Sequence, residues 1–369
     1  MTHRIVVWTL AVGMCVAVVL LEPAAAQAPA GTRAAVAKPT PPAKTWTART
    51  PDGQPDLQGF WNSTSFTQME RPKNVTKAFY TREEALEIQR RAAELESGET
   101  APLASIRTEG SITGPGQGQV QGPQPKNVDD VHYDFTEFGL DRSQAGAALN
   151  LRTSLVTDPP DGRIPPMTAE GQRRVAERLE ARKRMGRPHD AVQNLPLSER
   201  CIIMTRPGPP MLPQVYNNNY QIVQTPGYVL ILAEMIHDAR IIPLRGLAPL
   251  PSNARQWMGS SRGHWEGNTL VVETTNLTDK TAFQGSSENM RVIERFTRLD
   301  EDTLLYQFTI DDPATWARPW SAELPMKKTI GPLFEHACHE GNYGLYNTLA
   351  GARAEEKRAA EEAAKKTPK

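Results

Sequence analysis

Cysteine is scarce in this sequence, with three residues among 369. So few cysteines exclude a disulfide-dense scaffold and a zinc centre built from four thiolates. Neither sign of charge is in excess, because 42 Lys and Arg balance 42 Asp and Glu. Without a basic stripe, the sequence predicts no nucleic-acid partner. It also lacks a P-loop and a dinucleotide fingerprint, so we expect no cofactor.

Long apolar runs are absent except for one near the start. The run IVVWTLAVGMCVAVVLL (5–21) follows the short basic segment MTHR and precedes EPAAAQ. This order is typical of a signal peptide (1–26), cleaved after Ala26. A retained membrane anchor is the alternative, since the run approaches the ~18–20 residues that span a bilayer. We expect cleavage, a periplasmic or extracellular protein, and no membrane contact afterwards.

That location changes how the cysteines are interpreted. Cys15 lies in the predicted signal peptide, which leaves Cys201 and Cys338. Disulfides persist outside the cytoplasm, so an even pair there predicts a Cys201–Cys338 disulfide. Two buried free thiols are the alternative.

Helices and irregular segments dominate the first half of the predicted mature chain. Residues 27–49 are rich in Ala, Pro and Lys and predict a disordered tether, followed by a helical and loop-rich region (50–200). Residues 81–98 predict a helix with Thr81 and Glu84 as its capping box, and 168–186 predict a second helix capped by Thr168. Both are strongly charged, so we expect them on the surface.

Short strands separated by turns fill the next region, 201–348, and a charged tail (349–369) predicts a helix or a frayed end. Evenly spaced short strands with tight turns predict a mainly β, antiparallel domain. About eight strands can close into a barrel that holds one small ligand; an open sandwich is the alternative. The expected strands are 220–225, 228–234, 239–244, 268–275, 290–299, 303–310, 320–328 and 333–339.

Several phrases of the sequence resemble a large group of secreted bacterial proteins of unknown function. They are WMGSSRGHWEGNTLVVETTN (257–276), VIERFT (292–297), IDDPATWARPW (310–320), ACHEGNYG (337–344) and PDGQPDLQGFW (51–61). The resemblance implies a lipocalin-like β-barrel and secretion. It implies no activity.

Strand parity places acidic side chains inside the predicted barrel. Glu234 shares a face with Leu230 and Leu232, and Glu294 lies between Val292 and Phe296 on one face. A carboxylate inside a barrel needs a basic partner or has a raised pKa.

Arg240 is the partner we predict for Glu234 across the hairpin that joins their two strands. The guanidinium fork suits a bidentate carboxylate. Such a pair is either structural, fixing strand register, or an acid–base pair in a ligand cavity. Both interpretations stay open.

His237 and Asp238 would face opposite ways in a regular strand but can approach one another in a turn. A polar turn at the barrel mouth is the simpler interpretation. His237 could still meet a substrate there, since histidine titrates near neutral pH. The candidate catalytic set is Glu234, His237, Asp238, Arg240 and Glu294.

Polar and aromatic residues in loops are candidates for substrate contact: Tyr216, Asn218, Tyr220, Trp257, His339, Glu340 and Tyr343. Parity separates His336 from His339, and Cys338 is expected in a disulfide, so no metal site is predicted.

The preferred function is a cofactor-independent enzyme that acts on a small organic molecule by acid–base chemistry, as a lyase, isomerase or hydratase. A binding or carrier protein with the same cavity is one alternative. A glycosidase that uses two of the carboxylates is the other.

Overall fold

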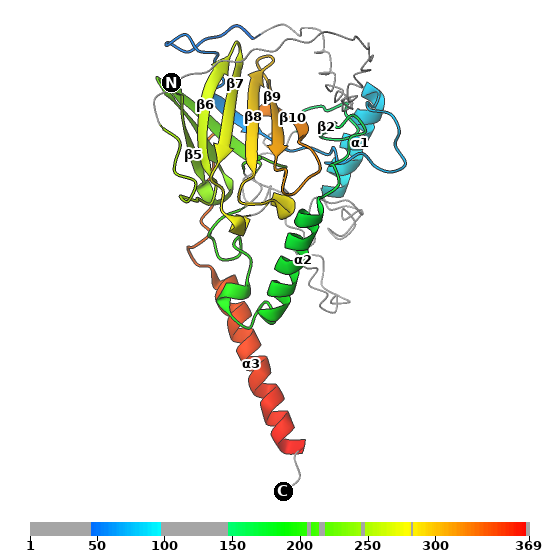
Figure 1. The fold of residues 1–369 in the computed structure, drawn as a ribbon, viewed down its shortest axis with the longest axis vertical. Coiled ribbons are helices and arrows are strands. Elements are labelled where there is room, and N and C mark those ends of the chain that lie inside the picture. Colours follow the sequence, from blue (N-terminus) through cyan, green and yellow to red (C-terminus); the bar gives the residue numbers. More distant parts are fainter. Residues whose placement is uncertain are drawn as a thin grey trace, which may run out of the picture. The chain divides into compact units, whose positions relative to one another are not determined.

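The structure is a computed structural model that describes residues 46–96, 147–204, 208–213, 218–244, 248–281 and 283–366, without the side chains of 92–96 (Figure 1). The predicted signal peptide and most of the predicted tether lie outside these residues. No helix in the described ranges is long and apolar enough to cross a membrane.

One antiparallel sheet of ten strands organises the described chain. Its order is β5-β4-β3-β1-β10-β9-β8-β7-β6, and β2 pairs with β10 at the side. Two strands come from the region expected to be helical and loop-rich, so that region is part of the same sheet. The strands are β1 (Gly59–Asn62), β2 (Val156–Asp158), β3 (Asn219–Thr225), β4 (Tyr228–Ala233), β5 (Ala239–Pro243), β6 (Ser260–Glu266), β7 (Thr269–Thr275), β8 (Arg291–Arg298), β9 (Thr303–Asp311) and β10 (Trp320–Thr329).

A single core fills the concave face of this sheet. Strands β8, β9 and β10 alternate buried and partly exposed residues, the period of two that one buried face requires. Large aromatic rings pack against one another there, with ring centres 5.1–6.5 Å apart. The rings are Phe283, Phe296, Tyr306, Phe308, Trp316 and Trp320.

The mainly β prediction is confirmed, but a closed lipocalin-like barrel is not. Backbone pairing ends at β5 on one side and at β6 on the other, and no ladder joins these two strands in the described chain. The two edges meet through side chains instead. A Cβ on Gly263 of β6 would lie 3.0 Å from Ile242 Cγ2 and 2.9 Å from Leu244 Cδ2. Pro243, the last residue of β5, has no N–H to extend pairing.

One expected strand is wrong and three strands were not expected. Residues 333–339 form no strand, because the chain leaves the sheet after Thr329 and Pro332 cannot donate to a ladder. Strands β1, β2 and β6 were missed. The first two are short, and β6 (SSRGHWE) lacks an apolar alternation.

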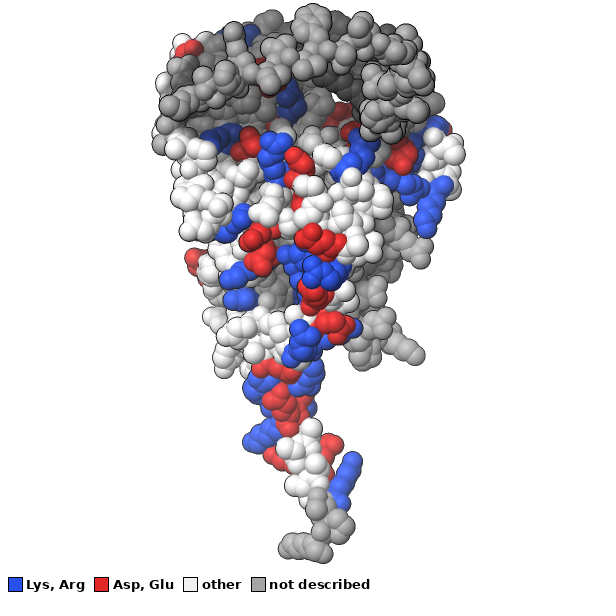
Figure 2. Space-filling model, viewed as in Figure 1, with Lys and Arg blue, Asp and Glu red and all other residues white. Residues whose placement is uncertain are grey.

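Three helices complete the described chain: α1 (Arg82–Glu96), α2 (Ala169–Arg184) and α3 (Tyr343–Lys366). Both predicted N-caps are confirmed. Thr81 and Glu84 form the reciprocal bonds of a capping box, and Thr168 Oγ1 accepts from Gly171 N at 3.0 Å. Lys, Arg and Glu are interspersed along α3, and of its residues only Ala352 is buried (Figure 2).

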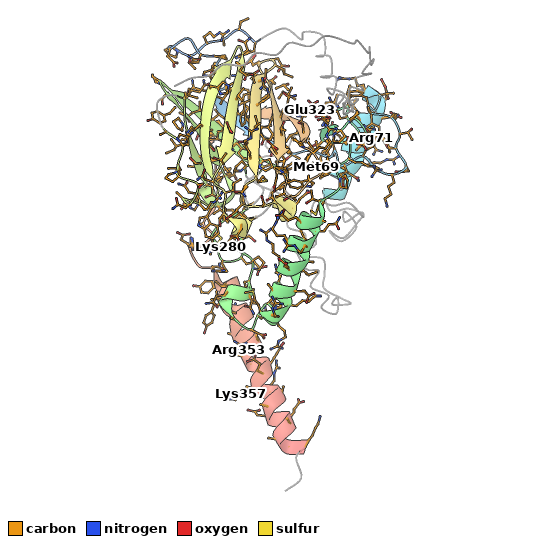
Figure 3. All side chains as sticks on the ribbon, viewed as in Figure 1. Met69, Arg71, Lys280, Glu323, Arg353 and Lys357 are labelled. Carbon is orange, nitrogen blue, oxygen red and sulfur yellow. A yellow bond between two sulfur atoms is a disulfide. The ribbon has the colours of Figure 1, made fainter. Side chains whose placement is uncertain are left out.

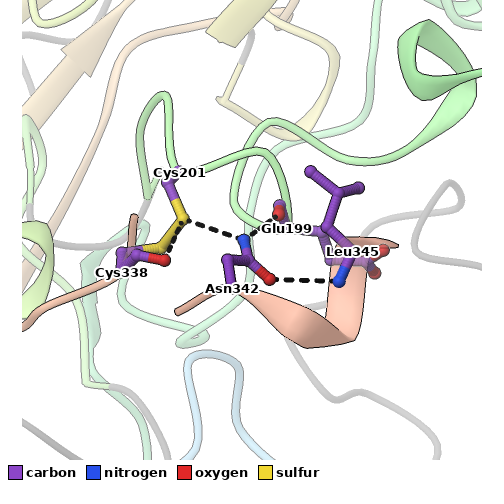
Figure 4. The surroundings of a disulfide bond; sticks show 5 residues. All are labelled: Glu199, Cys201, Cys338, Asn342 and Leu345. Atoms are coloured by element: carbon purple, nitrogen blue, oxygen red, sulfur yellow. Dashed lines mark hydrogen bonds between the residues drawn. A yellow bond between two sulfur atoms is a disulfide. The ribbon is translucent and has the colours of Figure 1, made fainter. Parts of the chain in front are cut away.

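The predicted disulfide between Cys201 and Cys338 is confirmed, and it fastens the segment before α3 to the segment after α2 (Figure 4). Asn342 lies beside it, donating from Nδ2 to Glu199 O at 3.4 Å and accepting from Leu345 N at 3.1 Å. Further along, Arg353 donates to Asp190 O at 2.8 Å. The start of α3 is therefore held at several points.

Replacing Cys201 and Cys338 together by serine should lower the free energy of unfolding by about 2–5 kcal/mol. The bridge closes a loop with a sequence separation of 137 residues, and such a link restricts the unfolded chain. Urea denaturation of the oxidised protein and the double variant measures the difference. Equal midpoints and slopes for the two would contradict the prediction.

Candidate functional site

A deeply buried pair of opposite charges lies inside the sheet. Strand β8 carries Glu294 on its inner face, and β5 carries Arg240 opposite Ile231 of β4. Arg240 Nη1 donates to Glu294 Oε1 at 3.0 Å, and Nη2 donates to Oε2. The side chains are 3% and 0% exposed, so this is a buried bidentate ion pair.

Neighbouring groups bond to both members of this pair, while Arg240 Nε is buried without a hydrogen-bond partner in the described chain. Tyr306 OH donates to Glu294 Oε1 at 2.8 Å and accepts from Met211 N at 2.9 Å. Burial and the Glu294 carboxylate raise the pKa of Tyr306 well above its usual value, so the phenol keeps its proton. Arg240 Nη2 also donates to Ser261 Oγ at 3.2 Å.

The predicted pairing of Arg240 with Glu234 is wrong. Strand β4 ends at Ala233, and its buried residues are Val229, Ile231 and Ala233 rather than the face with Leu230 and Leu232. Arg240 is in register with Ile231 and therefore points into the core, where it finds Glu294. The prediction failed because it took the face of Leu230 and Leu232 as the inner face of β4, and because Glu234 lies beyond the end of that strand.

Glu234 is nevertheless buried, at 2% exposure, and amides hold it. Asn219 Nδ2 donates to Glu234 Oε2 at 2.7 Å, and Asn62 Nδ2 donates to Asn219 Oδ1 at 2.7 Å. Burial raises the pKa of Glu234, and the bond from Asn219 opposes the rise. Glu234 is thus a buried acid without a basic partner in the described chain, the case for which the sequence predicts a raised pKa.

The turn after Glu234 has an unusual backbone. Met235–His237 form a single 3₁₀ turn, η5, in which Ile236 has φ 58° and His237 has φ 44°. Both lie in the left-handed region, which a β-branched residue rarely adopts, at a cost of about 1–3 kcal/mol each. Bonds at both ends hold the turn: Ala233 N donates to Asp238 O at 2.8 Å, and His237 N donates to Glu234 O at 3.1 Å.

Asp238 ends this turn in a partly buried position. Its Oδ2 is buried and has no hydrogen-bond partner within the described part of the chain. Burial raises the pKa of Asp238 to about 6, while the adjacent His237 opposes the rise. His237 itself is exposed. No hydrogen bond or ion pair joins the side chains of Asp238 and His237 within the described residues, so the dyad that a turn could allow is not formed here.

The expected substrate-contacting residues do not gather at this turn. Asn218 and Tyr220 are buried, and Trp257 is exposed with Lys280 Nζ 5.9 Å from its ring centre. His339, Glu340 and Tyr343 are exposed near the disulfide, at the connection to α3. Tyr216 lies outside the described residues. Among those residues, no group of three or more His, Cys, Asp and Glu side chains could hold a metal ion.

Sequence reasoning missed Asn62, Asn219 and Tyr306, whose partners lie on other strands and leave no local pattern. It also missed that GSSRG (259–263) matches the nucleophile-elbow pattern G-x-S-x-G. In the structure Ser261 lies within β6 rather than on a strand-to-helix turn, and its Oγ lies 2.8 Å from Thr274 Oγ1. Ser261 therefore supports the ion pair and is not arranged as a nucleophile.

Comparisons of the chain with protein-family models, curated proteins and solved structures found no match in any of the three. The assignment of the site therefore depends on geometry and chemistry.

Replacing Arg240 by Met or Glu294 by Leu should each lower the free energy of unfolding by about 3–5 kcal/mol, because each leaves a buried charge without its partner. The double variant should lose clearly less than the sum of the two. Urea denaturation at pH 7 measures this cycle. The matched control is the exposed pair Arg291–Glu273, 3.2 Å apart, whose coupling should stay under about 1 kcal/mol. If the losses in the free energy of unfolding at Arg240 and Glu294 were additive, the two residues would not be coupled as a buried ion pair.

Asp238→Asn should stabilise the protein at neutral pH and have little effect near pH 4. The folded-state pKa of Asp238 is about 6, above the unfolded value of about 3.9. Below about pH 4 the Asp238 carboxyl of the natural chain is protonated in both the folded and the unfolded state. The free energy of unfolding then falls as the pH rises through the folded-state pKa of about 6. The gain in the free energy of unfolding should reach about 1–2 kcal/mol at pH 7.5. This is less than the free energy that corresponds to the full pKa shift, because Asp238 is partly exposed. Urea denaturation across pH 4–8 tests this, with exposed Asp302→Asn as control; a gain independent of pH would refute it.

Proposed function

We propose that this protein is a cofactor-independent enzyme that acts on a small organic molecule by acid–base chemistry, as a lyase, isomerase or hydratase. The observation that carries the proposal is Asp238, which has a pKa of about 6, a buried Oδ2 without a partner in the described chain, and exposed His237 as its neighbour. Perturbed groups of this kind are concentrated at functional sites.

Asp238 is suited to be the general base. A base works best when its pKa lies near the operating pH, and above pH 6 this carboxylate is ionised. Oδ2 is buried and has no donor within the described residues, and a substrate that reaches the partly exposed carboxyl can supply the proton from a C–H or an O–H. The exposed imidazole of His237 can then return a proton to the leaving group or to the second carbon.

The strained backbone supports the same location. Two consecutive non-glycine residues, Ile236 and His237, lie in the left-handed region. Such strain persists only where the surroundings enforce it, and it is concentrated at active sites. Here the buried Glu234 carboxylate, fixed by Asn219, anchors the start of the turn. We assign Glu234 and Asn219 a positioning role.

Arg240 and Glu294 take no direct part in this proposal, although both belonged to the expected catalytic set. They bind one another in a bidentate ion pair, and Glu294 has no exposed surface through which a substrate could reach it. The glycosidase alternative loses Glu294 as an acid for the same reason. A carrier with its ligand inside the barrel is also disfavoured, because the aromatic, Leu and Met side chains of the core occupy the interior.

Export from the cytoplasm is part of the proposal. The Cys201–Cys338 disulfide supports it, since such bonds persist in oxidising compartments. The curl of the sheet and the resemblance to secreted bacterial proteins support a lipocalin-like architecture in which side chains rather than a ladder close the gap between β5 and β6.

Proton exchange offers a test that works whatever the net reaction is. The protein is incubated in deuterated water with a panel of small ketones, hydroxy acids, enoates and lactones, and ¹H NMR follows loss of carbon-bound protons. At least one compound should exchange, with a rate that rises through an apparent pKa near 6. Asp238→Asn should slow the exchange by about 10²-fold or more, the usual contribution of a general base.

Two comparisons make this test specific. His237→Gln should also slow exchange, whereas Asp302→Asn, at an exposed carboxyl in the turn before β9, should leave it unchanged. A natural rate in Asp238→Asn, or a pH profile without an inflection near 6, would remove Asp238 from the mechanism.

A further inference from the structure

A pocket lies beside α1, and none of its described lining residues belongs to the Asp238 turn. Figure 3 marks the place by Met69 and Arg71, which lie on the side of the sheet where α1 and β2 are found. The pocket has a volume of about 240 Å³ and is formed by three segments: the chain after β1, the start of α1, and the chain before β2. Its main lining residues are Ser65, Phe66, Pro72, Tyr80, Gln89 and Asn150.

Backbone bonds hold the walls of this pocket together. Leu155 N donates to Gln68 O at 2.8 Å, and Thr153 N donates to Ala78 O at 3.1 Å. Arg71 adds a side-chain bond to the second of these contacts, since its Nε donates to Thr153 Oγ1 at 3.0 Å. Two separate stretches of chain are thus tied to the same strand-like segment, so the pocket is largely formed in advance of any ligand.

The lining carries no formal charge. No Asp, Glu, Lys or Arg is among the described residues that line the pocket, whereas hydroxyl and amide side chains are frequent. An ionised ligand would lose water there without gaining a counter-charge. The chemistry therefore favours a neutral ligand with several hydrogen-bonding groups.

Asn150 indicates what such a ligand must provide. Its Oδ1 accepts from Arg152 N at 3.0 Å, which fixes the orientation of the amide. Its Nδ2 is buried and has no hydrogen-bond partner within the described residues. A buried N–H without an acceptor is costly, and an oxygen of a ligand would satisfy it.

Aromatic and aliphatic groups supply the other half of the surface. Phe66, Pro72 and Ile88 line the pocket together with Tyr80, whose ring already has Lys77 Nζ 5.5 Å from its centre. Phe66 is thus the ring best placed to receive a flat apolar face. The volume is below the usual ~300–1,000 Å³ of ligand pockets, so a single ring fits and a chain of rings does not.

We propose that this pocket binds one neutral, polyhydroxylated ring, a single uncharged sugar residue, with a hydroxyl oxygen on Asn150 Nδ2 and the apolar face of the ring on Phe66. A sugar ring combines several hydroxyls with an apolar face, which matches the mixed lining better than a hydrocarbon or an ion does.

Isothermal titration calorimetry of the oxidised full chain with glucose, galactose and N-acetylglucosamine tests this, with glucuronate and glucosamine as charged probes. At least one neutral sugar should bind saturably at millimolar concentration, and the charged analogues should bind roughly tenfold more weakly or worse. Asn150→Asp keeps the acceptor for Arg152 N but loses the Nδ2 donor, so it should weaken binding roughly tenfold, as loss of one buried hydrogen bond does.

Asn74→Asp is the matched control, because Asn74 is exposed and outside the pocket. This variant should bind the neutral sugar with the affinity of the natural chain. Phe66→Leu is a second variant, which keeps an apolar side chain and should weaken the sugar through loss of the flat ring. The proposal is overturned if no neutral sugar saturates, if charged sugars bind equally well, or if Asn150→Asp binds as the natural chain does.

Discussion

The buried ion pair between Arg240 and Glu294 is the constraint on which the curled sheet depends. Strand β5 has no ladder to β6, so backbone bonds alone leave that edge free. Arg240 reaches from this edge across the core to β8, and on the way it contacts Ser261 of β6. Burial of both charges is tolerable only because Tyr306 and the bidentate geometry satisfy the carboxylate. Arg240 therefore links the β5 edge to β8 through the ion pair and to the β6 edge through Ser261, where a closed barrel would use a ladder.

Sequence patterns predicted the fold well where strands are long and one face is buried. Strands β8, β9 and β10 show the period-two burial that their apolar residues indicated. The prediction failed where pairing with another segment, rather than the local sequence, decides whether a strand forms. Strand β6 has a Gly, a His and an Arg where apolar residues would mark a strand, and it forms because β7 pairs along its full length. The opposite holds for 333–339, which has strand-like residues but follows Pro332, and the disulfide holds Cys338 at Cys201.

The candidate site was located correctly in sequence but its contacts were not. Glu294 was placed inside because Val292 and Phe296 flank it in a regular strand, and a basic partner was required and found. Glu234 was placed inside for a reason that proved wrong, since β4 ends one residue earlier and the turn rather than the strand buries it. The alternation of buried and exposed residues holds only within a strand. The burial of a residue at the end of a strand can therefore be assigned only from the tertiary structure.

Three of the buried or partly buried acids show how surroundings divide similar groups into different roles. Glu294 has a guanidinium and a phenol donor, and no surface remains for a substrate. Glu234 has one amide donor and a raised pKa, which suits an anchor for the strained turn. Asp238 has the least support: one oxygen without a donor in the described chain, and a pKa of about 6. The Arg240–Glu294 pair is closed to solvent and offers no surface to a ligand, whereas the partly exposed Asp238 ends the turn between β4 and β5, where its carboxyl can meet one.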